Sequence, residues 1–458
     1  MPEDEHLLMT TRVRWHAHWV VPVAAPSLVD GTVVTEDDRI VWVGPRATAP
    51  SGGRDEELGD AILTPGLVNA HTHLDLTMMR GALEDLPFFA WVRILTAACR
   101  EVLTEADFAD AAMLGIAEGL AGGVTTYGDT APSDAAFAAM LRLRVRGIAF
   151  RETFGPDPLQ CVAAIATLRD QVAAMRPRAT ALVQVGVSPH APYSVSDALF
   201  AAVATYAAEE RLPVAVHIAE SEDEQALVTR GEGPFGDFLR GRDIAVAPRG
   251  AHPMALVERA GLLRAQTLLI HCVRVDDATV KAIAAAGCGV AHCPGSNARL
   301  GHGIAPLNAF LRAGARVGLG SDSMASNNRM DLLEEARLAS HQQRARLFAP
   351  DAVSAKAAFR LATLGGAEAL RLDDAIGSLE VGKQADLAVF ALPRYGAPVT
   401  DPSVALIFGP RPVTTRVIVA GEERLRDGVV VGFDEAITRR VADATDRLVR
   451  WRIARPVG

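Results

Sequence analysis

The sequence has no excess of positive charge and no long hydrophobic run. Its formal net charge is −9, which disfavours nucleic acid as a partner because such binding depends on lysine and arginine at phosphates. No apolar run reaches the roughly 18 residues of a membrane-spanning helix, and no basic amphipathic stretch indicates membrane-surface binding. The chain begins with Glu3, Asp4 and Glu5 in place of a basic segment before an apolar run, so we expect no secretory signal.

Cysteine and lysine are also scarce. The chain has five cysteines, an odd number without a Cys-x-x-Cys pair, so we expect neither a disulfide framework nor a structural zinc ribbon. This usage favours a reducing cytoplasm. The three lysines are Lys281, Lys356 and Lys383, so no lysine lies in the first 280 residues.

The chain is rich enough in apolar residues to build a large core, with 49% hydrophobic against 22% charged residues. Residues 13–21, 32–35 and 39–43 are rich in β-branched or aromatic residues and predict strands. From residue 63 onward, short apolar runs alternate with helical stretches such as 105–120, which is typical of buried parallel strands. The predicted strands are 63–69, 123–127, 147–150, 182–187, 214–217, 268–271, 289–292 and 317–320.

Eight strand–helix units predict an α/β fold, a (β/α)8 TIM barrel. Strand-like segments return at 387–390, 416–419 and 429–431, outside the barrel. We therefore expect both chain ends to form one small β-sandwich domain. The predicted division is 1–62 for the amino-terminal part of this domain, 63–375 for the barrel, and 376–458 for the carboxy-terminal part with a terminal helix.

Ionisable residues stand at the carboxyl ends of the predicted strands, where barrel enzymes build their sites. His71 and His73 end the first strand, and both imidazoles share one face because side chains alternate along a strand. Alone, this pair is equally well explained as two hydrogen-bonded polar residues. With His217 at the end of strand five and Asp322 at the end of strand eight, it becomes a nitrogen and oxygen set that suits zinc, with ferrous iron as the alternative.

Several motifs resemble the amidohydrolase superfamily, and within it the branch of methylthioadenosine/S-adenosylhomocysteine deaminases and related chlorohydrolases. They occur in order from about residue 63 to 390. They are PGLVNAHTH at 65–73, HIAE at 217–220, HCV at 271–273, GSD at 320–322 and GSLEVGKQADL at 377–387.

The resemblance implies one divalent metal held by His71, His73, His217 and Asp322. Glu220 would hand a proton to the ring nitrogen next to the attacked carbon, a role that fits a carboxylate just beyond a ligand. The alternative for Glu220 is a solvated carboxylate at a helix start. His271 would orient the attacking hydroxide, and Asp322 would pass the proton of the hydroxide to the departing ammonia.

The scarcity of lysine decides the number of metals that we expect. Amidohydrolases of the dihydropyrimidinase or urease kind carry a carboxylated lysine after the fourth strand, where it bridges two metals. This chain has no lysine before Lys281, and its fourth strand leads into SPHAPY at 188–193. A bridged two-metal centre of that type is therefore excluded.

Three residues are predicted to bind substrate. His190 lies in SPHAPY, which resembles the deaminase motif whose histidine bonds the heterocycle; a structural role in the turn is the alternative. Trp91 can stack on a flat ring or pack in the core. Arg151 aligns with an arginine near the ribose or its acidic substituent, or it pairs with Glu152 or Asp129. Ala90 stands where relatives carry a ribose-binding glutamate.

The resemblance thus implies an aminohydrolase that releases ammonia from an amino-substituted N-heterocycle. We expect a 6-aminopurine nucleoside such as methylthioadenosine, S-adenosylhomocysteine or aminodeoxyfutalosine as substrate. Guanine, pterin and triazine substrates, hydrolytic dechlorination and an inactive scaffold are the alternatives. The sequence leaves the oligomeric state open, including a homo-oligomer. We assign no chemical role to Asn297 and interpret His302 as structural.

Overall fold

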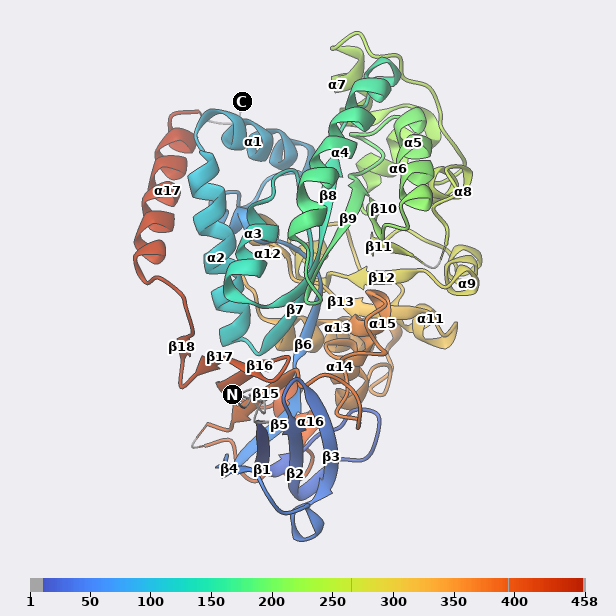
Figure 1. The fold of residues 1–458 in the computed structure, drawn as a ribbon. Helices are drawn as coiled ribbons and strands as arrows, with labels where there is room; N and C mark the ends of the chain where they lie inside the picture. Colours follow the sequence, from blue (N-terminus) through green and yellow to red (C-terminus); the bar gives the residue numbers. More distant parts are fainter. Residues whose placement is uncertain (1–10, 265, 394, 456–458) are drawn as a thin grey trace, which may run out of the picture.

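The computed structural model describes residues 11–455 except 265 and 394, so the predicted absence of a signal in residues 1–10 lies outside the described residues. Two sheets organise the chain. One is a barrel of parallel strands surrounded by helices, and the other is a mixed sheet at one end of the barrel (Figure 1).

Eight parallel strand positions form the barrel, as predicted. The eighth is divided into two short strands: the first pairs with the seventh strand and the second pairs with the first. The strands are β6 (Leu67–His73), β7 (Val124–Ala131), β8 (Arg146–Thr153), β9 (Val183–Pro189), β10 (Val214–Ile218), β11 (Thr267–His271), β12 (Gly289–His292), β13 (Arg316–Leu319) and β14 (Asp322–Ser323).

Helices follow the barrel strands, and their starts reflect local capping chemistry. Thr104 and Asp107 form a reciprocal capping box at the start of α2 (Glu105–Ala121), and the Ser196 side chain accepts a hydrogen bond from the backbone N–H of Leu199 in α5 (Asp197–Glu209). The other helices between the first strand and the eighth are α1 (Phe88–Glu101), α3 (Ala135–Leu143), α4 (Cys161–Met175), α6 (Glu222–Arg230), α7 (Gly233–Arg240), α8 (Met254–Arg259), α9 (Asp277–Ala286), α10 (Pro294–Arg299) and α11 (Leu307–Arg312).

The segment after the eighth strand is helical before the chain returns to the mixed sheet. It contains α12 (Met324–Asn327), α13 (Leu332–Leu347), α14 (Ala355–Leu361) and α15 (Leu364–Ala369); α16 (Pro402–Phe408) follows within the carboxy-terminal part. None of the helices among residues 11–455 is both long enough and apolar enough to cross a membrane.

Both chain ends contribute to the mixed sheet, which confirms the prediction of a β domain built from the two ends. Its central pairing joins them, because β5 is antiparallel to β15 with Leu63 opposite Val389. The strands are β1 (Arg12–Val20), β2 (Leu28–Glu36), β3 (Arg39–Pro45), β4 (Arg54–Glu57), β5 (Ala61–Pro65), β15 (Leu387–Ala391), β16 (Val413–Val419), β17 (Glu422–Arg426) and β18 (Val429–Val430).

The predicted first barrel strand at 63–69 is divided between the two sheets. Residues up to Pro65 belong to β5 of the mixed sheet, and the barrel begins with β6 at Leu67. Gly66 stands at the junction, where a Cβ atom would lie 2.2 Å from Thr125 of the next barrel strand. A side chain cannot fit there, so the close approach of the two strands at this junction requires a glycine. The predicted domain boundary between 62 and 63 consequently falls inside β5.

The last helix, α17 (Ala436–Ile453), leaves the mixed sheet and packs along α2 on the side of the barrel (Figure 1). Arg440 makes a two-pronged ion pair with Asp110 of α2 at 2.6 and 2.8 Å. The Thr445 hydroxyl donates to the backbone oxygen of Met78 at 2.8 Å. The chain end thereby supports the 3-10 segment Leu74–Met79, which directly follows His73.

One buried ion pair joins the barrel to the mixed sheet. The guanidinium of Arg146 on β8 donates to both carboxylate oxygens of Asp386 at 2.8 and 3.0 Å, and both side chains are almost completely buried. Asp386 also accepts from the backbone N–H of Ala420 at 2.8 Å.

We expect Arg146→Ala to lower the free energy of unfolding by about 3–5 kcal/mol, because it leaves the Asp386 carboxylate buried without its cation. Urea denaturation followed by circular dichroism measures the change. The matched control is Arg169→Ala, which removes an exposed pair with Glu209 and should leave the midpoint almost unchanged. Equal midpoints for the two variants would contradict the structural role of the buried pair.

Candidate metal centre and active site

Four of the predicted site residues meet at the carboxyl end of the barrel. Nε2 of His71 lies 3.2 Å from Oδ1 of Asp322, and Nε2 of His73 lies 3.5 Å from the same oxygen. One nitrogen from each of His71, His73 and His217 lies within 4.8 Å of the others. The parallel register of β14 on β6 sets Asp322 opposite Thr72, between the two histidines.

The chemistry of these four side chains fits a divalent metal. Ligands at about 2.1 Å around a tetrahedral ion lie roughly 3.4 Å apart, close to the separations at Asp322. Burial lowers the pKa of His71 to about 4, which keeps the imidazole neutral at pH 7. Burial opposes ionisation of Asp322, but its hydrogen bond with His71 and the nearby imidazoles hold its pKa well below the usual range. Neutral imidazoles and a carboxylate are the forms that ligate metal.

Neighbouring groups orient these ligands. Nδ1 of His217 donates to the backbone oxygen of His190 at 3.2 Å, which leaves Nε2 as its free nitrogen. The Ser326 hydroxyl donates to Oδ2 of Asp322 at 3.1 Å, so Oδ1 stays directed at the histidines. Such partners fix the tautomer and direction of metal ligands.

The backbone is strained where these residues leave the strands. Ala219 after β10, His271 and Cys272 at the end of β11, and Asp322 at the start of β14 have φ values of 53°, 71°, 46° and 57°. Side chains other than glycine rarely adopt this left-handed region, and such strain persists where the surrounding structure enforces it. The fold therefore holds the ends of strands five, six and eight in conformations that local preference does not favour.

Glu220 and His271 lie next to each other on one side of the four ligands. Oε1 of Glu220 is 3.4 Å from Nε2 of His271, and that nitrogen is 4.0 Å from Oδ2 of Asp322. Burial opposes ionisation of Glu220, but the nearby His271 and His302 give a net lowering of its pKa. Glu220 is thus a buried carboxylate that can accept a proton and then deliver it. It is not a solvated residue, because it is only 4% exposed.

Sequence reasoning missed two supporting residues. Nε2 of His302 lies 3.3 Å from Oε1 of Glu220, so His302 adjoins the candidate proton donor. Nδ1 of His271 lies 2.9 Å from Oδ1 of Asn297, an acceptor that fixes the proton on Nδ1 and leaves Nε2 facing the site. Asn297 lies in α10 and His302 follows that helix, both after the seventh strand. The sequence did not show which side chains they contact.

His190 and Glu152 occupy the other side of the site. His190 Nδ1 bonds to the Ser194 hydroxyl at 2.7 Å, and burial lowers the His190 pKa to about 3. Glu152 at the end of β8 is also buried, which raises its pKa well above the ordinary value, as do the nearby Asp75 and Asp129. Oxygen and nitrogen atoms of Glu152, His190 and His217 lie within 4.8 Å of one another. Sequence reasoning considered Glu152 only as a partner of Arg151.

Arg151 does not join this group. Its Nε donates to Gln171 of α4 at 2.9 Å, and no carboxylate of the described residues lies within 4.0 Å of it to form an ion pair. Phe150 packs inside the barrel with Ala70 and Ile270, and alternation along β8 directs Arg151 toward the helices instead. Its binding of substrate stays a prediction that this geometry does not support.

Trp91 lies in an aromatic cover over the site. Its indole N–H donates to the backbone oxygen of Ala325 at 3.2 Å, and its ring stacks on Phe88 at 6.2 Å between centroids. Phe88 in turn meets the His302 ring edge-on at 4.6 Å. Tyr193 stacks on Phe235 at 4.3 Å. These rings connect the loops after strands one, four and five, so Trp91 is a packing residue of the cover in this conformation.

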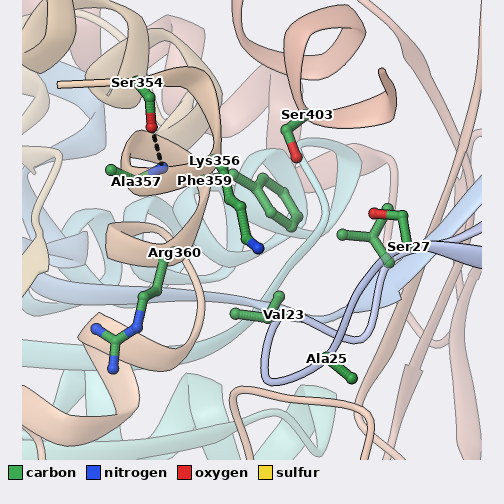
Figure 2. Close-up of a pocket in the computed structure, with 10 residues that line it drawn as sticks. Val23, Ala25, Ser27, Ser354, Lys356, Ala357, Phe359, Arg360 and Ser403 are labelled. Carbon is green, nitrogen blue, oxygen red and sulfur yellow. Dashed lines mark hydrogen bonds between the residues drawn. The ribbon is translucent and has the colours of Figure 1, made fainter. Parts of the chain in front are cut away.

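Two cavities lie outside the four-ligand cluster. One of about 220 Å³ lies where the loop after β1 meets α14 and α16, and Figure 2 shows Lys356 and Ser403 beside it; it contains none of the predicted site residues. The second, of about 550 Å³, is lined by His302, Arg274 and His252. His302, which adjoins Glu220, is one of the residues that line the second cavity.

The chain belongs to the amidohydrolase family, which matches residues 62–428. It is 34% identical over 435 residues to a 5-methylthioadenosine/S-adenosylhomocysteine deaminase of Desulforudis audaxviator, covering 94% of this chain and 97% of the relative.

Solved structures agree with this assignment. The fold is similar to an adenosine deaminase of Xanthomonas campestris with bound zinc, with a TM-score of 0.84, 30% identity, and coverage of 96% of this chain and 98% of that one. It is also similar to a zinc-complexed atrazine chlorohydrolase of Arthrobacter aurescens, with a TM-score of 0.82, 25% identity, and coverage of 95% and 100%.

A buried carboxyl group behind the site makes stability depend on pH. Glu335 of α13 accepts from the backbone N–H of Gly295 at 2.9 Å and from the side-chain amide of Asn327 at 2.8 Å. It thereby connects α10 and α12, the helices that follow strands seven and eight. Burial raises its pKa from 4.5 to about 8. The folded state therefore holds a proton that the unfolded state releases between these pH values, and stability falls as pH rises through this window.

We expect Glu335→Gln to remove this part of the pH dependence. One such group contributes a slope of up to about 1.4 kcal/mol per pH unit, so the variant should show a flatter fall in unfolding free energy between pH 5 and 8. Denaturant titrations at several pH values compare the two proteins. Parallel pH profiles would show that Glu335 is already ionised in the folded state.

Proposed function

We propose that the chain is a metal-dependent aminohydrolase that releases ammonia from an amino-substituted N-heterocycle, with a 6-aminopurine nucleoside as its substrate. The observation that carries this proposal is the convergence of His71, His73, His217 and Asp322, with Glu220 and His271 on one side. Methylthioadenosine, S-adenosylhomocysteine and aminodeoxyfutalosine are the candidate substrates, and relatives named as deaminases support this class.

Zinc is the metal that we propose for the four ligands, with ferrous iron as the alternative. Zinc-containing family members support this choice. A divalent cation there would lower the pKa of water toward neutrality and so supply a nucleophile at pH 7.

The protein groups then divide the proton transfers. Glu220, starting as a carboxylate, accepts one proton from the attacking water and delivers it to the ring nitrogen next to the attacked carbon. His271, with Nδ1 fixed by Asn297, directs Nε2 toward the attacking oxygen. Asp322 accepts the second proton and passes it to the amino group, which leaves as ammonia. General acid–base catalysis of this kind contributes roughly 10²–10⁴-fold to a rate.

His190 is proposed to hydrogen-bond the heterocycle, and Trp91 to support the aromatic cover above it. The tautomer of His190 follows from its partner: the Ser194 hydroxyl donates to Ala191 at 3.1 Å, so it accepts from Nδ1 of His190. Nε2 of His190 is therefore an acceptor. The five free thiols of the described chain fit a reducing cytoplasm, where we place the enzyme.

Hydrolytic dechlorination or deamination of a triazine is the second candidate function. The similarity to a chlorohydrolase at 25% identity favours it, since the same attack by hydroxide can expel chloride. Glu220 and Asp322 weigh toward deamination, because a ring nitrogen and a leaving amine both need protons. A scaffold without catalysis is disfavoured, because each of the four ligand positions is filled.

Ammonia and chloride release across a substrate panel tests the proposal. The purified protein, loaded with about one zinc per chain, is assayed with adenine nucleosides, free purines, pterins, aminotriazines and chlorotriazines. We expect ammonia from the nucleosides. Chloride release with no ammonia from any compound would overturn the proposal in favour of a dechlorinase, and absence of bound metal after reconstitution would favour a scaffold.

Glu220→Gln should keep the metal and slow turnover by about 10²-fold or more, because the amide cannot carry the proton. Metal analysis and kcat on the preferred substrate measure the two effects. The matched control is Glu222→Gln, since Glu222 is exposed and pairs with Arg274; its rate should stay near wild type. Near-normal turnover of Glu220→Gln would refute the assignment.

Asp322→Ala should lose both bound metal and activity, because it removes a ligand and the acceptor of the second proton. Zinc content after dialysis, read beside the circular dichroism spectrum, separates loss of the site from loss of the fold. A folded variant that retains one zinc per chain would show that Asp322 is not a ligand.

A further inference from the structure

Glu152 is a buried carboxyl group that takes no part in the proposed proton transfers. It is 6% exposed at the carboxyl end of β8, and its Oε1 has no hydrogen-bond partner among residues 11–455 as described. Leaving a buried acceptor unpaired is costly, so such groups usually have a partner or a function. A bound ligand can provide the missing donor.

The surroundings of Glu152 favour an organic ligand over a second metal ion. A carboxyl oxygen of Glu152 lies within 4.8 Å of a ring nitrogen of His190 and of a ring nitrogen of His217. Nδ1 of His217 is engaged by the backbone of His190, and its remaining nitrogen belongs to the four-ligand set. One imidazole nitrogen cannot ligate two metals, so Glu152 and His190 do not complete a second centre.

The position of Glu152 around the barrel places it on a different side of the site from the residues that are proposed to transfer protons. Glu220, His271 and Asp322 follow strands five, six and eight, whereas Glu152 ends strand three and His190 follows strand four. A heterocycle whose amino group faces the first three residues extends its substituent toward strands three and four. Nε2 of His190 is an acceptor. Oε1 of Glu152 has no partner among the described residues, so it can accept a hydrogen bond from a ligand.

We propose that Glu152 is a specificity residue that accepts a hydrogen bond from a sugar hydroxyl of the nucleoside substrate; this inference rests on the proposed deaminase function. Carboxylates are established partners of ribose hydroxyls in nucleotide-binding proteins. The loop residue before Trp91 is Ala90, whose methyl group cannot accept such a bond. Free purines, pterins and triazines have no sugar hydroxyl, so Glu152 selects nucleosides against them.

A double-mutant cycle, in which one change is made in the protein and the other in the substrate, tests this contact. The wild type and Glu152→Ala are each assayed with methylthioadenosine and its 2′,3′-dideoxy analogue. For the wild type, we expect removal of the hydroxyls to lower kcat/KM by about 3–10-fold, the scale of a hydrogen bond between neutral groups. Glu152→Ala should lose as much on the hydroxylated substrate, mainly through KM, and should barely distinguish the two compounds. An equal effect of hydroxyl removal in both proteins would overturn the inference.

Controls separate this contact from damage to the site. Glu152→Ala should retain its zinc, and loss of zinc would overturn the inference by showing that Glu152 serves the metal cluster. If Glu152→Ala does not fold, Glu152→Leu replaces it; its side chain has no acceptor, so removal of the hydroxyls should have little effect, and an undiminished effect overturns the inference. Glu209→Gln, an exposed carboxyl-to-amide change, should behave as wild type.

The two proposals fail in different ways. If the wild type releases no ammonia from any heterocycle, the deaminase function itself is wrong. If the wild type deaminates the nucleoside, but removal of the hydroxyls has the same effect in the wild type and in Glu152→Ala, only the role of Glu152 is wrong. Activity confined to rings without hydroxyls would also overturn the role of Glu152 and leave the hydrolase intact.

Discussion

The closure of the barrel between its eighth and first strands is the constraint on which the site depends. The pairing of β14 with β6 sets Asp322 level with Thr72, so one carboxylate faces the imidazoles of His71 and His73. Closure requires close approach at Gly320, where a Cβ atom would lie 2.9 Å from the Cβ of His71. The left-handed backbone at Asp322 then turns its side chain toward the histidines. The close approach at Gly320 and the left-handed backbone at Asp322 thus set the distances between Asp322 and the two histidines.

The mixed sheet contributes to the same arrangement from the opposite end of the barrel. The chain enters β6 directly from β5 through Gly66, so the strand that carries His71 and His73 continues from a strand of the mixed sheet. The pair of Arg146 and Asp386 connects β8, which carries Glu152 near its carboxyl end, to the segment before β15. Two site-bearing strands are thereby fixed at their amino ends, which limits how far their carboxyl ends can shift.

Much of the fold could be predicted from the sequence because barrel strands leave a local pattern. The apolar runs from 123–127 to 317–320 and helices such as 105–120 match the observed elements, and the histidines at strand ends converge as expected. The division of 63–69 into two strands was missed, because it depends on contact between Gly66 and Thr125. Long-range contact also determines the neighbours of His302 and Asn297, which meet Glu220 and His271 only after folding. The direction of Arg151 follows from its register in β8, one residue from Glu152, which local patterns do not define.

The support that α17 gives to the segment after His73 has a consequence for the order in which the molecule is completed. The backbone oxygen of Met78 in this segment accepts a hydrogen bond from Thr445, which lies 367 residues further along the sequence. Met78 also belongs to the apolar cluster that contains Phe88 and Trp91. The support for the aromatic cover at Met78 therefore cannot form until α17 has been synthesised, long after the segment that it supports.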